Sequence, residues 1–168
     1  SWEKTALQFA IEIEDLDIIK VLLNHPKIDV NCKTKAFDAK KDYDIESSPL
    51  YDAIYVRNIE IIKLLLSHPN IDVNQILFQQ IEKIPIKKTI LNFVIQSEKV
   101  EIVKLLLSHP KIDVNKISII EKRGSSQFLP LDTALEVSSI EIYKLLLEHK
   151  NIDINLINIF ILKNNKIS

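Results

Sequence analysis

Glycine is nearly absent from this chain of 168 residues, because Gly124 is the only one. A glycine-rich loop of the kind that cradles phosphate is therefore excluded. Methionine is absent, and Cys32 is the single cysteine. One cysteine rules out an internal disulfide and fits a reducing compartment, so we expect a cytoplasmic, intracellular location.

Neither sign of charge is in surplus, since 22 lysines and arginines face 23 aspartates and glutamates. The net charge of −1 provides no field that would attract nucleic acid, and we expect no nucleic-acid partner. Long hydrophobic runs are missing too. No uncharged stretch approaches the roughly 20 apolar residues of a membrane-spanning helix, so we expect no integral membrane segment. Hydrophobic residues still make up 46% of the chain, enough for the core of one domain.

What the chain does contain is a repeat. Four segments of 27 residues align without gaps, at residues 5–31, 48–74, 89–115 and 129–155. Their second halves read LDIIKVLLNHPKIDVN, IEIIKLLLSHPNIDVN, VEIVKLLLSHPKIDVN and IEIYKLLLEHKNIDIN. The second and third of these agree at 13 of 16 positions. Such self-similarity is typical of a solenoid, in which each unit buries its apolar face against its neighbours.

Each unit predicts two short helices. Ser48 followed by Pro49 is an N-cap with proline at the first helical position, and Leu50, Ala53 and Ile54 lie on one helical face. The other first helices are expected to start at Thr5, Thr89 and Leu129, of which the leucine cannot cap. The second helices are expected to start with capping side chains at Asp15, Asn58 and Ser139, and without one at Lys99.

These residues resemble the ankyrin repeat. The clearest copies are Ser48-Pro49-Leu50 with Ala53, and Val100–Leu107 followed by Asp113-Val114-Asn115. The resemblance implies an all-α fold, an ankyrin-like α-solenoid of four helix-turn-helix repeats with β-hairpin fingers. The chain departs from the family where a glycine usually joins the two helices, because that position holds Glu14, Arg57, Glu98 and Ser138.

We expect residues 1–168 to form a single ankyrin repeat domain, with fingers at 32–47, 75–88, 116–128 and 156–168. Two fingers have the pattern of β-hairpins: residues 75–79 and 84–88 flank a turn at Glu82, and residues 116–120 lead to a tip at Gly124. The finger at 32–47 is polar and charged and is predicted to be mobile. Residues 156–168 resemble half of another finger, so we expect a segment of a longer chain.

Two ladders of polar residues first suggest metal binding. One position per unit holds a histidine, about 8–10 Å from the next if the helices pack normally, too far apart for one zinc ion. We interpret these residues as structural, interacting with helix ends: His25, His68, His109 and His149. An Asp-x-Asn motif follows each histidine but lacks the converging oxygens and the glycine of a calcium loop. We expect Asp29, Asp72, Asp113, Asp153 and their asparagines to bond turn backbone within and between repeats.

A catalytic site is not predicted. His25, the histidine nearest to Cys32, is seven residues away beyond a proline turn, which disfavours a catalytic thiol. No Gly-x-Ser-x-Gly, His-Glu-x-x-His or kinase pattern occurs. We therefore expect no enzyme activity, no cofactor, no metal and no small-molecule substrate.

The resemblance implies a non-catalytic scaffold or adaptor module that binds a protein partner through its concave face and fingers. The candidate contacts are positions that vary among units while the framework leucines stay fixed. They are Lys4, Ser47, Lys88 and Phe128 before each first helix, and Glu12, Tyr55, Gln96 and Glu136 at its end. The alternative is that these are unconstrained surface positions. Two other functions stay open: the substrate-recruiting arm of an enzyme whose catalytic domain lies outside this segment, and a membrane-surface adaptor using Phe78, Ile120 and Phe160.

Overall fold

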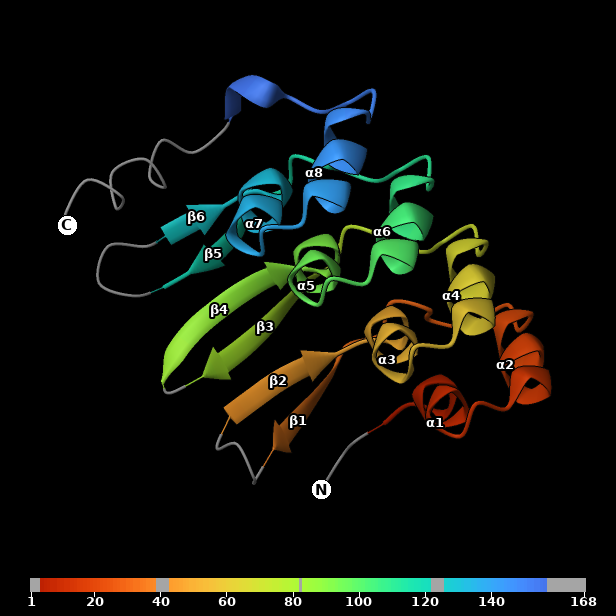
Figure 1. Ribbon diagram of the computed structural model, residues 1–168. Helices are drawn as coiled ribbons and strands as arrows, with labels where there is room; N and C mark the ends of the chain where they lie inside the picture. The colour runs from red at the N-terminus through yellow and green to blue at the C-terminus, as the bar shows by residue number, and fades with distance from the viewer. Residues whose placement is uncertain (1–3, 39–42, 82, 122–125, 157–168) are drawn as a thin grey trace.

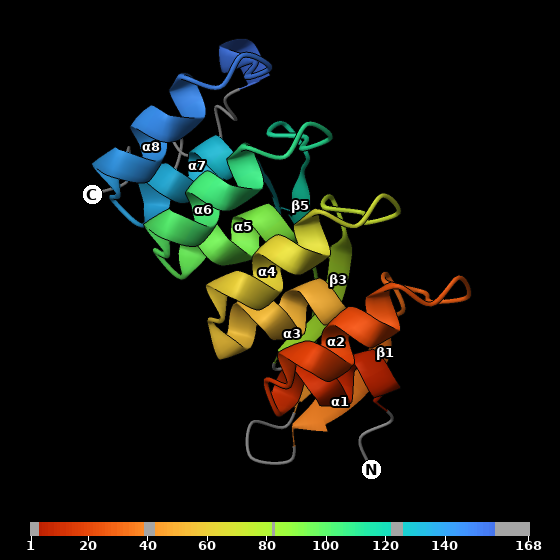
Figure 2. The same ribbon diagram turned by 90° about the vertical axis from the view of Figure 1, so that its right-hand side faces the viewer.

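Pairs of short helices alternate with β-hairpins along the chain (Figure 1). The computed structural model describes residues 4–38, 43–81, 83–121 and 126–156. Four first-row helices lie side by side: α1 (Ala6–Glu12), α3 (Pro49–Val56), α5 (Ile90–Gln96) and α7 (Pro130–Glu136). A second row contains α2 (Leu16–Leu23), α4 (Ile59–Leu66), α6 (Val100–Leu107) and α8 (Ile140–Leu147), and a 3-10 turn, η1 (Ile154–Leu156), follows. Figure 2 shows the second row from outside, stacked from α2 to α8.

The first-row helices begin as the sequence predicts. The side-chain oxygens of Thr5, Ser48 and Thr89 each accept a hydrogen bond from a backbone N–H three residues later, at 3.1–3.3 Å. At the fourth helix the Asp132 carboxylate instead accepts from the backbone N–H of Leu129, at 2.9 Å.

In the second row, Asp15 and Asn58 cap as predicted, and Lys99 makes no side-chain cap bond. The prediction for Ser139 is wrong, because its hydroxyl makes no cap bond to α8 either. Lys99 instead donates its ammonium to the carbonyl of Ile54 at the end of α3, at 3.1 Å, and so links two repeats.

The turn between the two helices of each repeat has left-handed backbone geometry, although no glycine stands there. The φ angles of Glu14, Arg57, Glu98 and Ser138 are 55°, 63°, 52° and 56°. A residue with a Cβ atom is strained in this region by about 1–2 kcal/mol. All four repeats therefore join their two helices through a turn residue with the same backbone geometry.

The core lies between the two rows and between consecutive repeats. The framework leucines of the first row are at most 2% exposed: Leu7, Leu50, Leu91 and Leu131. In the second row, Leu65 is completely buried, as expected from apolar residues that surround more than one face of α4. The second and third repeats are therefore covered on both sides by their neighbours.

The fingers join into one antiparallel sheet of six strands in the order β1-β2-β3-β4-β5-β6. The strands are β1 (Thr34–Asp38), β2 (Tyr43–Ser47), β3 (Ile76–Ile81), β4 (Ile84–Thr89), β5 (Ser118–Ile120) and β6 (Ser126–Phe128). The prediction of a solenoid is confirmed, but the prediction of an all-α fold is not, because the hairpins form a β-sheet beside the helices. The polar finger at 32–47 also contains paired strands, β1 and β2, and β2 pairs onward with β3 through Ile45 and Gln79. Of the finger expected at 156–168, Leu156 ends η1, and the rest lies outside the described residues.

Asparagines join consecutive repeats through the loops that follow the second-row helices, as the Asp-x-Asn motif predicted. The side-chain amide of Asn31 donates to the carbonyl of Asn70 at 2.7 Å, and its oxygen accepts from the N–H of Asp72 at 2.8 Å. Asn74 makes the same pair of bonds to the third repeat, and Asn115 to the fourth. Within each loop, an aspartate accepts from the asparagine N–H at 2.9 Å. We call the three inter-repeat pairs the asparagine clamps.

Replacing Asn74 with alanine removes both bonds of the middle clamp. Because each net hydrogen bond contributes about 0.5–1.5 kcal/mol, we expect the free energy of unfolding to fall by about 2 kcal/mol. Chemical denaturation measures this, with the exposed Asn24→Ala as the control. Equal stability of the two variants would show that water replaces the clamp at no cost.

Replacing Glu98 with glycine relieves the left-handed strain but adds chain entropy to the unfolded state. Because the relief of strain is the larger effect, we expect the free energy of unfolding to rise by about 0.5–1 kcal/mol. In the matched control, Glu101→Gly in α6, glycine lies in an ordinary helix and should cost about 1 kcal/mol. A lower melting temperature for Glu98→Gly would contradict the strain argument.

Candidate functional site

The predicted contact residues lie where the first-row helices meet the hairpins. The Lys4 ammonium is 2.7 Å from Glu12 Oε2, and Lys88 Nζ donates to Gln96 Oε1. In each pair, the residue before a first helix reaches the residue at its end. The two sets of variable positions therefore lie on one surface in these repeats. We call this surface the concave face.

Charges of both signs lie on the concave face. Burial lowers the pKa of the Lys88 ammonium, and the Glu136 carboxylate of the next repeat acts in the opposite direction. Glu12, Gln96 and Glu136 are all exposed. The face thus offers carboxylates and an amide to solvent beside a half-buried cation.

Ser47 differs from the expectation for a contact residue. It is only 8% exposed because it ends β2 directly before α3, and its hydroxyl donates to Asp52. Burial raises the pKa of Asp52, while hydrogen bonds from Ser47 and Gln8 and the charge of Lys4 oppose the rise. The hydroxyl of Ser47 therefore serves an internal contact, and variability alone did not identify an accessible side chain.

Phe128 is half-buried at the base of the last hairpin. Its carbonyl accepts from the Asn92 amide at 3.4 Å, and the same amide donates to Ser118 at 2.6 Å. The hydroxyl of Thr133 in turn donates to Asn92 Oδ1 at 3.1 Å. This buried network fixes the β5–β6 hairpin against α5 and α7, so the position of Phe128 is set by structural bonds.

The aromatic side chain of Tyr55 is 69% exposed, more than that of Phe9 at 57%. Its ring stacks on Tyr51 with 6.4 Å between centroids, and Tyr51 contacts Phe93 of the next repeat at 4.8 Å. The sequence pattern predicted Tyr55 as a contact residue but did not predict the rings of Tyr51 and Phe93 that support it. The recurrence of phenylalanine at the fifth position of the first and third units, Phe9 and Phe93, was the available signal.

The hairpin sheet supplies the other wall of the concave face. One residue from each of the strands β2 to β6 forms a cross-strand row: Ile45, Gln79, Ile86, Ile120 and Ser126. Because side chains alternate along a strand, Ile86 shares its face with Lys88, whose ammonium reaches Gln96 on α5. The row therefore faces the first-row helices. Lys87, on the opposite face, pairs with Glu121 at 2.7 Å.

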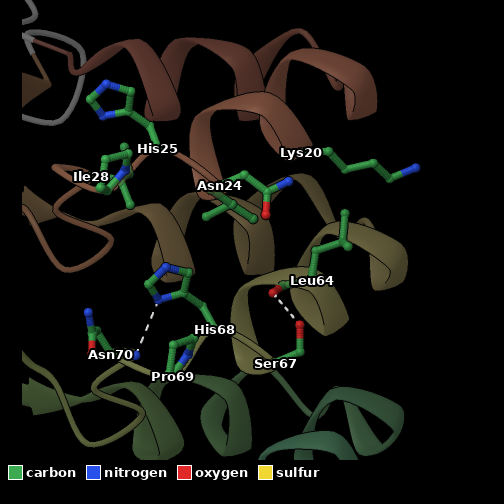
Figure 3. Close-up of a pocket in the computed structure, with 11 residues that line it drawn as sticks. Lys20, Asn24, His25, Ile28, Leu64, Ser67, His68, Pro69 and Asn70 are labelled. Atoms are coloured by element: carbon green, nitrogen blue, oxygen red, sulfur yellow. Dashed lines mark hydrogen bonds between the residues drawn. The ribbon is translucent and has the colours of Figure 1, made fainter.

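The four histidines stabilise their own loops. Each imidazole Nδ1 accepts from the backbone N–H two residues later at 3.2 Å, as His68 does from Asn70 (Figure 3). The structural interpretation is thus confirmed, and His109 also makes a backbone hydrogen bond to Leu66 at the end of α4. His25 and His68 line a surface pocket of about 440 Å³ between the ends of α2 and α4. Among the described residues, no group of three or more potential metal ligands occurs.

Protonation of His109 removes the lone pair that accepts the N–H of Lys111. Burial, followed by the charge of Lys111, lowers the pKa of His109 from its usual 6.5, against a backbone hydrogen bond to Leu66. The folded state then binds fewer protons than the unfolded state, so this contribution is present above about pH 6.5 and is lost as pH falls through the lowered pKa.

We therefore expect the free energy of unfolding to fall between pH 7.5 and 5, as measured by urea denaturation. In His109→Asn, an amide oxygen accepts in place of Nδ1 but does not titrate, and the pH dependence should be smaller. A pH profile identical to that of the unsubstituted chain would contradict this role of His109.

Two rows of short paired helices with hairpins at one side define a solenoid of the ankyrin type. A family model described as ankyrin repeats in three copies matches residues 1–76 and again residues 75–158. The chain therefore belongs to the ankyrin repeat family. Ankyrin repeats are generally protein–protein interaction modules and are typically non-catalytic.

Among solved structures, the crystal structure of EF0377, an ankyrin repeat protein, resembles this chain with a TM-score of 0.59 and 23% sequence identity. The match covers 92% of this chain but 66% of that one, and at this identity it supports the fold alone. No curated protein matches the sequence. None of the described helices has the length and apolar character needed to cross a membrane.

Proposed function

We propose that this chain is a non-catalytic, protein-binding module of a scaffold or adaptor, and that its partner binds on the concave face. The observation that carries the proposal is the ring of Tyr55, which is largely exposed yet held by stacking on Tyr51. A large aromatic surface that is already ordered loses little entropy on binding, which is why tyrosine is enriched in binding hot spots. An intracellular location is part of this proposal, since Cys32 is a free thiol.

The surroundings of Tyr55 support a protein partner. The isoleucines of the cross-strand row provide apolar area, and exposed carboxylates and amides at the helix ends provide a polar rim. Two polar pairs of the face are engaged within the chain: Lys4 with Glu12 and Lys88 with Gln96. A partner would therefore meet polar groups that are already held in place.

Capture experiments with the immobilised chain and mass spectrometry test this proposal. Adjacent residues on opposite faces of β4 give a matched pair, because Ile86 is on the concave face and Lys87 is not. A partner of the concave face should be captured by the unsubstituted chain and by Lys87→Ala, and depleted for Ile86→Ala. Capture that is equal for both variants would place binding elsewhere.

With a partner identified, Tyr55→Ala should weaken binding about five-fold, or about 1 kcal/mol, since the lost contact is an exposed aromatic. Isothermal titration measures this change, and Lys63→Ala on the outer row is the control. The melting temperature should change little because Tyr55 is outside the core. A large loss of stability without a change in affinity would assign Tyr55 to packing.

A further inference from the structure

The pocket of about 440 Å³ lies at the junction between the first and second repeats, and none of its lining residues belongs to the concave face. The ends of α2 and α4 and the loop after each helix border it (Figure 3). Leu23, Ile28 and Leu64 give it apolar walls. Most of the other lining residues are exposed, including His25 and Asn70, so the pocket opens to solvent. We call it the first-junction pocket.

At the second junction, a lysine of the chain itself fills the equivalent place. The Lys111 ammonium, from the third repeat, donates to the carbonyl of Pro69 in the second repeat at 3.2 Å. In the alignment of the units, Asn70 stands where the third repeat has Lys111, and Pro26 stands where the second repeat has Pro69. Among the described residues, no hydrogen bond to the Pro26 carbonyl replaces that of the lysine. The shorter asparagine therefore leaves this place open at the first junction.

The electrostatics of the first-junction pocket favour a cation. Asn24, at the end of α2, and Ser67, at the end of α4, both line it, so two helix C-termini border the pocket. A helix C-terminus carries a partial negative charge and interacts favourably with a cation. Of the lining residues, Lys20 carries a charge of its own, and Figure 3 shows its side chain extended away from the two histidines. The ammonium of Lys20 therefore leaves the histidine side of the pocket open.

The loop on the second repeat's side of the pocket is held in place at both of its backbone groups. The N–H of Asn70 donates to His68 Nδ1 at 3.2 Å, and its carbonyl accepts from the side-chain amide of Asn31 at 2.7 Å. The second of these bonds belongs to the first asparagine clamp. A ligand that enters the pocket thus meets a loop that is already ordered, which lowers the entropic cost of binding.

We propose that the first-junction pocket binds a lysine side chain of a protein partner, in the place that Lys111 fills at the second junction. The aliphatic stem of that lysine lies between the walls of Leu23 and Ile28, and its ammonium donates to the carbonyl of Pro26. Because the pocket is separate from the concave face, this contact is independent of Tyr55. The proposal can therefore fail while the proposed function stands, and the reverse is also true.

Titration of the full chain with Nα-acetyl-lysine amide, followed by NMR of the backbone amides, tests the proposal. The changes in chemical shift should be largest at His68 and Asn70 and should saturate in the millimolar range, as expected for so small a ligand. Nα-acetyl-norleucine amide has a similar aliphatic stem but no ammonium. It should bind about ten-fold more weakly, because the hydrogen bond from a charged donor is lost.

Two reciprocal substitutions make the test specific to the pocket. Asn70→Lys gives the first junction the lysine of the second, so the pocket is filled from within and the shifts caused by Nα-acetyl-lysine amide should disappear. Lys111→Asn opens the second junction in the same way, and a second set of saturable shifts should appear at His109. Both positions are exposed, so the amide spectra should otherwise remain those of the folded chain.

Four results would overturn the proposal. Saturable shifts that persist in Asn70→Lys would place the ligand elsewhere on the chain. Equal affinity for the norleucine amide would show an apolar groove without a preference for a cation. The absence of a second set of shifts in Lys111→Asn would show that the lysine is not what closes the second junction. The absence of any saturable shift in the unsubstituted chain would show that the pocket does not bind lysine.

Discussion

The contact between consecutive repeats is the interaction on which the rest of the structure depends. Helices of seven or eight residues are too short to be stable in water by themselves. Their stability comes from burial against the neighbouring repeat, as the zero exposure of Ile62 and Val103 shows. Local features such as the Thr5 cap adjust where each helix begins, but none of them replaces this burial.

The same contact explains why the hairpins form one sheet. Packed helices lie about 8–10 Å apart, and two strands at about 4.8 Å each occupy nearly the same distance. A stack that advances by one helix diameter per repeat therefore carries each hairpin to pairing distance from the next. The pairs Ile45–Gln79 and Ile86–Ile120 join the hairpins across two junctions. The asparagine clamps join the loops that lead from the second-row helices into the hairpins, so they add to the hold that the paired hairpins have on each junction.

The elements that depend on local chemistry could be predicted from the sequence. Helix positions followed from periodicity and from caps such as Ser48, and the Asp-x-Asn motif predicted its own turns and clamps. The sheet across repeats was missed because Gln79 and Ile45 are far apart in sequence and nothing local marks their pairing. The β1–β2 hairpin was missed since one face of the sheet is solvated and its strands are polar. The recurring left-handed turn was not predicted because the usual glycine is absent, yet Arg57 has a φ angle of 63°.

Residues vary among the repeats for two reasons: some must fit a neighbour across a junction, and others lie at exposed positions. Only the exposed fraction of the side chain distinguishes the two groups. The fourth residue of one repeat contacts the fifth residue of the next, which pairs Gln8 with Asp52, Tyr51 with Phe93 and Asn92 with Thr133. These residues vary because each must fit its neighbour across a junction. Tyr55 varies at an exposed position and rests on one of these junction pairs. The stacking that holds Tyr51 therefore also orders Tyr55 before any partner arrives, and such preorganisation lowers the entropic cost of binding.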